Sequence, residues 1–243
     1  MDKRERTLAV LLAAGSGKRM ESKTKKQYML IGGKPVIYYS LKTFQESFID
    51  EIVLVVSPKD VEFCRKEIVE KYGFDKVRRI VEGGKERYHS VAAGLNSASD
   101  FDYVFIHDGA RPMVSAEILD RTLAAVREWG ACVAGVPVKD TIKIADEEGM
   151  IAATPNRNFM WSVQTPQVFS YPLIKEAYAG LLEKEKELLD AGVAVTDDAM
   201  VVETLTGRPV KLVEGSYKNI KITTPEDIQT AEIFLKNSER KSL

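Results

Sequence analysis

The chain of 243 residues contains little cysteine and little histidine, two of each. Cys64 and Cys132 lie far apart and form no CxxC pair, and His89 and His107 complete no metal-ligand spacing with them. Both cysteines stand in apolar-patterned segments, which predicts two reduced core residues. The sequence therefore excludes a disulfide-built scaffold and a zinc-binding motif.

An excess of charge of one sign and a long apolar run are also missing. The net charge is −1 at pH 7, so no overall field favours nucleic acid or an anionic membrane. The first residues, MDKRERT, are charged, and the apolar run after them is about seven residues long, too short for a signal peptide or a membrane span. We therefore expect a cytoplasmic, globular protein that binds neither nucleic acid nor membrane.

The standard phosphate-binding motifs are absent as well, although the stretch from Leu8 to Tyr28 has their chemistry. Gly17-Lys18 is followed by Arg19 rather than Ser or Thr, so it is not a P-loop, and Met20 replaces the third glycine of the dinucleotide fingerprint. A short apolar run, then glycines, then many cations still predicts a strand that ends in a polyphosphate-binding loop. A glycine turn with solvated lysines beside it is the alternative. The cations are Lys18, Arg19, Lys23, Lys25 and Lys26.

Apolar runs alternate with segments of helical periodicity along most of the chain. This order predicts an α/β fold, a single Rossmann-like and mostly parallel sheet with helices on both faces. We expect strands at 8–14, 51–56, 77–81, 103–106, 131–138, 160–164 and 209–213, and helices at 36–45, 57–72, 88–96, from 115, around 173–182, at 197–206 and from 224, with 183–190 as a charged, solvated run.

The pattern changes at Asp140. Residues 141–145 and 150–153 alternate around the turn 146–149, which predicts a hairpin with few bulky apolar side chains. We expect residues 1–243 to form a single domain, with 140–158 as an arm. Because an isolated hairpin is marginally stable in water, the arm should pair with a second subunit and make a homodimer.

Glycines, cations and a carboxylate follow several of the predicted strands. In an open parallel sheet, ligands bind outside the carboxyl ends of the strands, so this composition predicts a nucleoside triphosphate pocket with Mg²⁺. Other interpretations of these residues stay open. Asp108 could cap a turn or pair with Arg111, and His107 could be an edge histidine whose hydrogen bonds are satisfied. The cations at 87, 139 and 143 could be solvated. The residues after the strands are Gly15, Gly17, Lys18, Arg19, Lys26, Gly83, Gly84, Lys85, Arg87, Ser90, Asp108, Gly109, Arg111, Lys139, Asp140 and Thr141.

Seven segments resemble, in order, those of the cytidylyltransferases of the non-mevalonate isoprenoid pathway. They are LAAGSGKRM with KKQY, VEGGKERYHSV, HDGARP, VPVKDTIK, NRNFMWSVQTPQVF, VTDDAM and NIKITTPEDI. The resemblance runs to about Ile228 and implies a nucleotidyltransferase domain. The expected reaction is transfer of the cytidylyl group of CTP to 2-C-methyl-D-erythritol 4-phosphate, with Mg²⁺ as cofactor, in isoprenoid precursor biosynthesis.

The same resemblance implies a role for each matching residue. Arg19 and Lys26 would act in catalysis, and Asp108 would be the protein group nearest Mg²⁺. Gly109 departs from the family's commoner alanine, and the arm would deliver Arg157 into the neighbouring subunit's pocket. The sugar phosphate would be bound by Arg157, Lys221, Thr141, Asp108, Arg111, Thr165 and Thr196, and the nucleotide by Ala13, Ala14, Gly15, Gly17, Lys18, Gly84, Ser90 and Gly109.

Three other functions compete with this prediction. A ribitol-5-phosphate cytidylyltransferase would share fold, CTP and chemistry, but HDGARP and the Thr-Pro-Glu-Asp after Lys221 resemble the methylerythritol enzymes more. A dinucleotide oxidoreductase is disfavoured by Met20 and the lysines of the loop. A non-catalytic nucleotide-binding module would differ in releasing no pyrophosphate from CTP.

Overall fold

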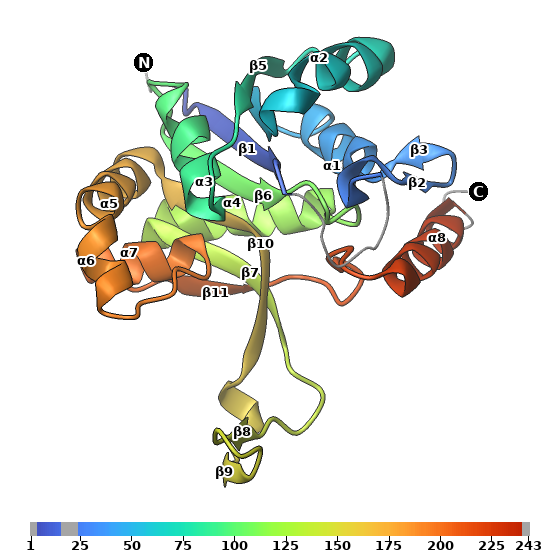
Figure 1. Ribbon diagram of the computed structural model, residues 1–243. Coiled ribbons are helices and arrows are strands. Elements are labelled where there is room, and N and C mark those ends of the chain that lie inside the picture. Colours follow the sequence, from blue (N-terminus) through green and yellow to red (C-terminus); the bar gives the residue numbers. More distant parts are fainter. Residues whose placement is uncertain (1–3, 16–23, 240–243) are drawn as a thin grey trace.

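The computed structural model describes residues 4–15 and 24–239. A central seven-stranded sheet has the order β11-β7-β10-β6-β1-β4-β5. Strand β10 is antiparallel to both of its neighbours, and the other pairings of the described sheet are parallel, so the predicted α/β fold is confirmed (Figure 1). The strands are β1 (Thr7–Ala13), β4 (Glu51–Val56), β5 (Val77–Glu82), β6 (Tyr103–Asp108), β7 (Ala131–Pro137), β10 (Trp161–Ser170) and β11 (Lys211–Glu214).

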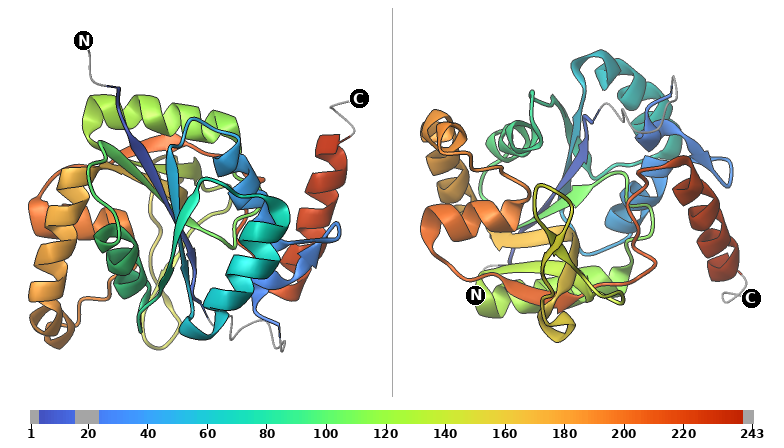
Figure 2. Two further views of the ribbon diagram at one scale, coloured as in Figure 1. Left: turned by 90° about the horizontal axis from the view of Figure 1, so that it is seen from above. Right: turned by 60° about the horizontal axis from the view of Figure 1, so that its bottom comes forward.

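Helices cover both faces of the sheet because its central strands are apolar on both sides (Figure 2). In β1, Leu8 and Val10 pack with α3, α5 and α7, while Ala9 and Leu11 pack with α1, α4 and η4. All four side chains are fully buried, which fixes the carboxyl end of β1 in the middle of the sheet. The helices are α1 (Val36–Gln45), α2 (Val61–Phe63), α3 (Arg87–Asn96), α4 (Ala116–Trp129), α5 (Tyr171–Glu183), α6 (Glu185–Asp190), α7 (Asp198–Thr206) and α8 (Pro225–Glu239), and η4 is the π-helix Cys64–Glu70.

Local sequence explains where several helices begin and end. The Asp197 side chain caps α7 by accepting a hydrogen bond from the Met200 N–H. Helix α4 ends at Gly130 and α7 at Gly207, both with positive φ, at 74° and 67°. Glycine adopts this left-handed conformation without steric cost, so each helix stops where the sequence places one.

The structure corrects three predicted elements. The single helix predicted at 57–72 is η3 (Pro58–Asp60), then α2, then the π-helix η4. The strand predicted at 160–164 continues to Ser170, with a register shift between Val163 and Gln167 that accommodates Pro166, which has no N–H to give to the ladder. The helix predicted to end in a charged, solvated run at 183–190 is divided into α5 and α6; the run is mostly exposed, as predicted, and Glu185 of α6 accepts a hydrogen bond from Tyr88.

A hairpin arm projects from the sheet below β7 and β10 (Figure 1). Its strands are shorter than predicted, so Thr141 lies before the first of them. Large apolar side chains are exposed along it: Ile144, Met150, Ile151 and Phe159. Its elements are β8 (Ile144–Ala145), β9 (Ile151–Ala153) and the turn η5 (Arg157–Phe159).

The chain returns from β11 to the carboxyl edge of the sheet before it enters α8. Ile222 and Ala231 pack against Ile31 of the small strand β2 (Leu30–Ile31), which pairs with β3 (Lys34–Pro35). The Ile222 N–H also donates to the Ala110 carbonyl at 2.8 Å. This packing brings the neighbouring Lys221 next to the end of β6.

Candidate active site

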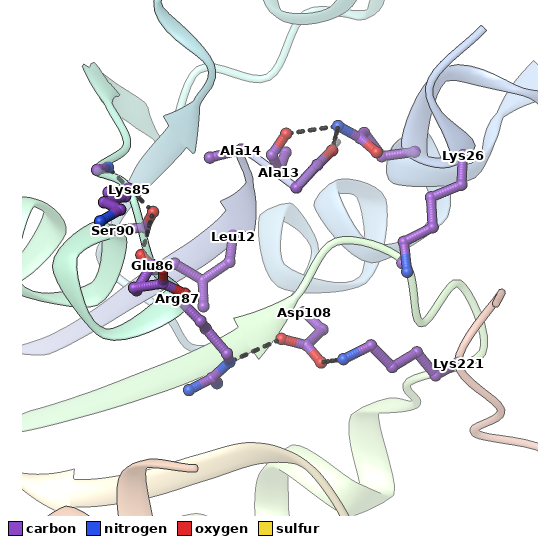
Figure 3. Close-up of a pocket in the computed structure, with 14 residues that line it drawn as sticks. Leu12, Ala13, Ala14, Lys26, Lys85, Glu86, Arg87, Ser90, Asp108 and Lys221 are labelled. Atoms are coloured by element: carbon purple, nitrogen blue, oxygen red, sulfur yellow. Dashed lines mark hydrogen bonds and ion pairs between the residues drawn. The ribbon is translucent and has the colours of Figure 1, made fainter. Parts of the chain in front are cut away.

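A cavity of about 380 Å³ lies where β1 and β6 end (Figure 3). Strand order reverses at β1, since β4 follows it on one side and β6 returns on the other, and such a switch point is where open α/β sheets bind ligands. Four cations and two carboxylates line the cavity. Its residues are Leu12, Ala13, Ala14, Gly15, Lys26, Gln27, Gly84, Lys85, Glu86, Arg87, Ser90, Asp108, Ala110 and Lys221.

Asp108 lies between two of these cations (Figure 3). Lys221 Nζ is 2.7 Å from its Oδ2, and Arg87 Nε is 3.5 Å from its Oδ1. Burial alone would raise the pKa of Asp108, but the charges of Arg87 and Lys221 outweigh it and hold that pKa well below its ordinary range. The carboxylate is therefore ionised at neutral pH.

The prediction that Arg87 is solvated is wrong. Its guanidinium forms a bidentate ion pair with Asp198, with both N···O distances at 2.8 Å. Asp198 is fully buried and also accepts a hydrogen bond of 2.5 Å from the Tyr178 hydroxyl. Burial opposes the charge of Arg87, but Asp198 and Asp108 raise its pKa well above the usual value, so Arg87 is a fixed cation of the cavity wall.

The glycine segment after β5 forms the opposite wall. The Gly84 N–H donates to Ser90 Oγ at 3.1 Å. A Cβ at Gly83 would collide with the Ala14 side chain and lie 2.8 Å from Ser90 Oγ, and one at Gly84 would collide with His89. Only glycine lets this backbone approach β1 so closely, so the predicted residues Ala14, Gly84 and Ser90 are brought together.

Two buried side chains stand behind Asp108. The Asp108 N–H donates to Thr165 Oγ1 at 3.1 Å, and Thr165 Oγ1 lies 3.0 Å from His107 Nδ1. His107 Nε2 is 3.2 Å from the Arg111 carbonyl, so a neutral ring that donates from Nε2 and accepts at Nδ1 satisfies every group. Burial lowers the pKa of His107 to about 4. His107 is satisfied as predicted, but it lies in an interior strand.

A second cavity, of about 520 Å³, adjoins the first and shares Lys221 with it. The predicted residue Arg111 lines it and donates to the Asn219 carbonyl at 2.8 Å. Arg111 Nε and Asn219 Oδ1 are buried without a hydrogen-bond partner, and unpaired buried polar atoms of this kind are costly. Arg111 Nε needs an acceptor and Asn219 Oδ1 needs a donor, so a ligand with both acceptor oxygens and hydroxyl groups matches this pair. The cavity is lined by Arg111, Val136, Pro137, Val138, Lys139, Asp140, Ile142, Ser162, Gln164, Tyr217, Asn219, Ile220 and Lys221.

Several predicted site residues line neither cavity. Arg157 is exposed on the arm, where it donates to the Lys139 carbonyl at 2.7 Å, and Thr141 is exposed at the base of the arm. Thr196 is exposed just before α7 and contacts Met200. A Cβ at Gly109 would lie 3.1 Å from the Leu12 carbonyl oxygen, which is tight for the alanine common in the family. Gly17, Lys18 and Arg19 lie outside the described residues.

Sequence reasoning missed Gln27 and Asp198 as parts of the site, whereas Lys85 was among the cations predicted to lie at this edge of the sheet. Gln27 and Asp198 lie inside segments that were matched to the family, KKQY and VTDDAM, but a buried amide and a buried carboxylate have no signature of their own in sequence. Arg87 pairs with Asp198 across 111 positions, so only the fold brings them together. Lys85 lines the first cavity beside Gly84.

The residues present fit a Mg²⁺ that arrives with a nucleotide. Among residues 4–15 and 24–239, no three His, Cys, Asp or Glu side chains cluster closely enough to hold a metal ion. The first cavity does contain an ionised carboxylate, Asp108. Mg²⁺ is usually bound by one or two carboxylates while substrate phosphates and water complete its octahedron, so this donor set suits a metal held mainly by the triphosphate.

The described helices include none that is long and apolar enough to cross a membrane.

Comparison with known proteins agrees with the geometry. The profile of the family described as 2-C-methyl-D-erythritol 4-phosphate cytidylyltransferase matches residues 7–237. Two proteins of that name, from Lachnospira eligens and Lachnoclostridium phytofermentans, are 52% and 47% identical to the chain, cover 94% and 97% of it, and are each covered over 98% of their own length.

A solved structure of 4-diphosphocytidyl-2C-methyl-D-erythritol synthase from Anaerococcus prevotii superposes with a TM-score of 0.80 at 36% identity, covering 96% of both chains. A crystal structure of 2-C-methyl-D-erythritol 4-phosphate cytidylyltransferase from Thermus thermophilus has a TM-score of 0.72 at 32% identity, covering 93% of this chain and 98% of its own. The chain belongs to the 2-C-methyl-D-erythritol 4-phosphate cytidylyltransferase family, as the seven sequence segments predicted.

Proposed function

We propose that the chain transfers the cytidylyl group of CTP to 2-C-methyl-D-erythritol 4-phosphate and releases pyrophosphate. The observation that carries this proposal is the first cavity, where Lys26, Lys85, Arg87 and Lys221 line the wall together with an ionised Asp108 at the switch point of the sheet. Family membership supplies the two substrates. The product is 4-diphosphocytidyl-2-C-methyl-D-erythritol.

The reaction needs no general base, because a phosphate monoester is already an oxyanion when it attacks the α-phosphorus of CTP. The site agrees with this, since His107 is buried, neutral and fully hydrogen-bonded. What the protein must supply is alignment of two polyanions and fixed positive charge around the α-phosphate. Lys26, which points into the cavity in Figure 3, carries that role with Arg19.

The nucleotide occupies the first cavity. Backbone groups of Ala13, Ala14 and Gly84 face the base, with Ser90 beside the ribose. Asp108 would hold a Mg²⁺ that arrives with the nucleotide, and the ion would supply positive charge beside the phosphates. Lys85 and Arg87 add fixed charge on the α3 side.

The sugar phosphate occupies the second cavity. Lys221 lines both cavities and can therefore contact the attacking phosphate where the two ligands meet. Arg111 and Asn219 offer a donor and an acceptor, each without a partner, to the phosphate and the sugar hydroxyls. Thr165 acts from behind, through the Asp108 N–H and His107, while contacts from Thr141 and Thr196 rest on the family resemblance.

We also propose that the arm pairs with the arm of a second subunit and brings Arg157 to that subunit's sugar-phosphate cavity. Exposed Ile144, Met150, Ile151 and Phe159 are costly in a monomer and are the groups that such a dimer would cover. Arg157 projects from the turn η5, where its guanidinium donates to the Lys139 carbonyl. A guanidinium there suits a phosphate that a neighbouring subunit holds.

Pyrophosphate release tests the proposal. The protein is incubated with CTP and Mg²⁺, together with 2-C-methyl-D-erythritol 4-phosphate in one reaction and ribitol 5-phosphate in another. We expect stoichiometric pyrophosphate with the first sugar phosphate and little with the second. Equal rates with both, or release only with ribitol 5-phosphate, would contradict the assignment, and no release with either would leave only nucleotide binding.

A further inference from the structure

Gln27 is a buried amide at the edge of the first cavity, only 2% exposed. Its Nε2 donates to the Ala13 carbonyl at 2.6 Å and to the Gly15 carbonyl at 3.1 Å. Since a side-chain amide nitrogen carries two hydrogens, both of its donors are used on the backbone where β1 leaves the sheet. The side chain thus fixes the first residues after the strand.

The hydrogen bond from Gln27 to the Ala13 carbonyl also determines the direction of the Ala14 N–H, which belongs to the same peptide group. Leu12 accepts a hydrogen bond from the Gly109 N–H at 2.9 Å, so the Leu12 carbonyl faces the β6 side of β1. Backbone polar groups alternate sides along a strand, and the C=O and N–H of a trans peptide point in opposite directions. The Ala13 carbonyl therefore faces Gln27 on the β4 side, and the Ala14 N–H faces the side where β6 ends at Asp108.

The turn that carries Gln27 is anchored on its other side as well. Lys25 Nζ is 2.6 Å from Asp60 Oδ2, and the Tyr28 hydroxyl lies 3.2 Å from the same oxygen and 3.1 Å from Cys64 Sγ. The Tyr28 N–H donates to the Lys25 carbonyl at 2.9 Å and closes the turn. Lys25 and Tyr28 hold the turn to the η3–η4 segment, while Gln27 holds it to β1.

Lys26 lies between these anchors and lines the cavity. Gln27 is its covalent neighbour, so a shift of Gln27 relative to β1 moves Lys26 relative to Ala13 and Ala14. One side chain therefore fixes the spacing between the backbone that faces the base and the cation that faces the phosphates.

We propose that Gln27 is a positioning residue that joins base recognition to phosphoryl chemistry. It touches neither reacting atom. It holds the Ala13–Ala14 backbone, which lines the cavity, and Lys26 at a fixed spacing, so that the base and the α-phosphate of the same nucleotide are positioned together. The proposal rests on the proposed function, and it predicts that loss of Gln27 weakens the preference for cytosine together with the rate. Cytosine and uracil differ in donor and acceptor at the edge that such backbone groups read.

The test compares two variants of similar shape. Gln27→Met fills the same space without a donor, and Gln27→Glu keeps the shape but can donate at most one of the two hydrogen bonds, and only when its carboxyl is protonated. We expect kcat/KM for CTP to fall about tenfold or more in each, and the ratio of kcat/KM for CTP to that for UTP to fall about tenfold. Equilibrium binding of CTP and UTP should show the same loss of preference without turnover.

Gln45→Met is the matched control. Gln45 ends α1 just before β4 starts, at the opposite edge of the sheet, and its Oε1 accepts from the Lys76 N–H at 2.9 Å. The control removes one side-chain amide bond to backbone, as the test variants do. It should leave the CTP to UTP ratio unchanged, whatever it does to stability.

The outcomes separate this proposal from the reaction itself. If the wild-type protein makes no cytidylyl product, the proposed function fails, but CTP and UTP binding still decides the role of Gln27. A Gln27 variant with a lower melting temperature and an unaltered CTP to UTP ratio overturns the proposal. If neither variant folds, hydrogen exchange of the wild-type Ala14 amide decides: greater protection by CTP than by UTP supports it, and equal protection overturns it.

Discussion

At the scale of the residue, Lys26 bears most directly on the proposed chemistry. Its charge is expected to act mainly in the transition state, when negative charge gathers on the α-phosphate. Lys26→Ala should therefore lower kcat by about 10² or more with little change in CTP affinity. Steady-state kinetics and CTP titration check this, with Lys71→Ala on the surface pair with Glu67 as control. Near-normal kcat in Lys26→Ala would refute the role. Arg19 should behave in the same way.

His107 predicts a dependence of stability on pH. Burial lowers its pKa to about 4, whereas the unfolded chain binds that proton near pH 6.5. The unfolded state therefore gains protons first as the pH falls, so stability is full above about pH 6.5 and is lost as the pH drops toward 4. The loss amounts to about 2 kcal/mol by pH 5 and about 3 kcal/mol by pH 4.

Urea denaturation of the wild type and of His107→Gln, at pH 7.5 and pH 5, measures this loss. The variant should be less stable at pH 7.5 but should lack about 2 kcal/mol of the pH dependence. His89→Gln, which changes the only other histidine, should keep it. An equal pH dependence in the His107 variant and the wild type would contradict the assignment.

At the scale of the element, Asp198 connects three helices. It stands in the first turn of α7, accepts from Tyr178 of α5, and pairs with Arg87 of α3. Breaking a buried ion pair by removing one charge is strongly destabilising, because the other stays buried without compensation. Asp198→Asn should cost about 3–5 kcal/mol.

Chemical denaturation of Asp198→Asn measures that cost. Glu67→Gln breaks the exposed pair with Lys71 and should leave stability nearly unchanged. If both substitutions have the same small effect, the Arg87–Asp198 pair does not hold these helices together.

The same elements show how far sequence reasoning reaches. Apolar runs and glycines predict β1, β4, β5 and β6 and the position of the cavity, because apolar strands and the close backbone approach at Gly83 and Gly84 leave local signals. The antiparallel course of β10 and the pairing of Arg87 with Asp198 leave none, since each depends on which strand or helix becomes a neighbour after folding. A lone arginine near a glycine turn looks solvated until its partner, 111 positions away, is placed.

At the scale of the whole molecule, the arm predicts a shared active site. Arg157→Ala and Lys26→Ala should each be nearly inactive as homodimers. In a mixed dimer, one pocket has an intact Lys26 and receives an intact Arg157 from its neighbour, while the other pocket lacks both. Activity should then return, approaching half of the wild-type value per heterodimer. Mixed dimers as inactive as both parents would show that Arg157 does not serve the neighbouring subunit.

One measurement tests the central claim directly, that the sugar phosphate attacks the α-phosphorus of CTP in this pocket. The protein is incubated with CTP, Mg²⁺ and 2-C-methyl-D-erythritol 4-phosphate that carries ¹⁸O at its non-bridging phosphate oxygens. Mass spectrometry then measures the ¹⁸O content of each product. In-line attack by the sugar phosphate predicts that all of the label appears in 4-diphosphocytidyl-2-C-methyl-D-erythritol and none in pyrophosphate. Label in pyrophosphate, or the absence of a labelled cytidylyl product, would contradict it.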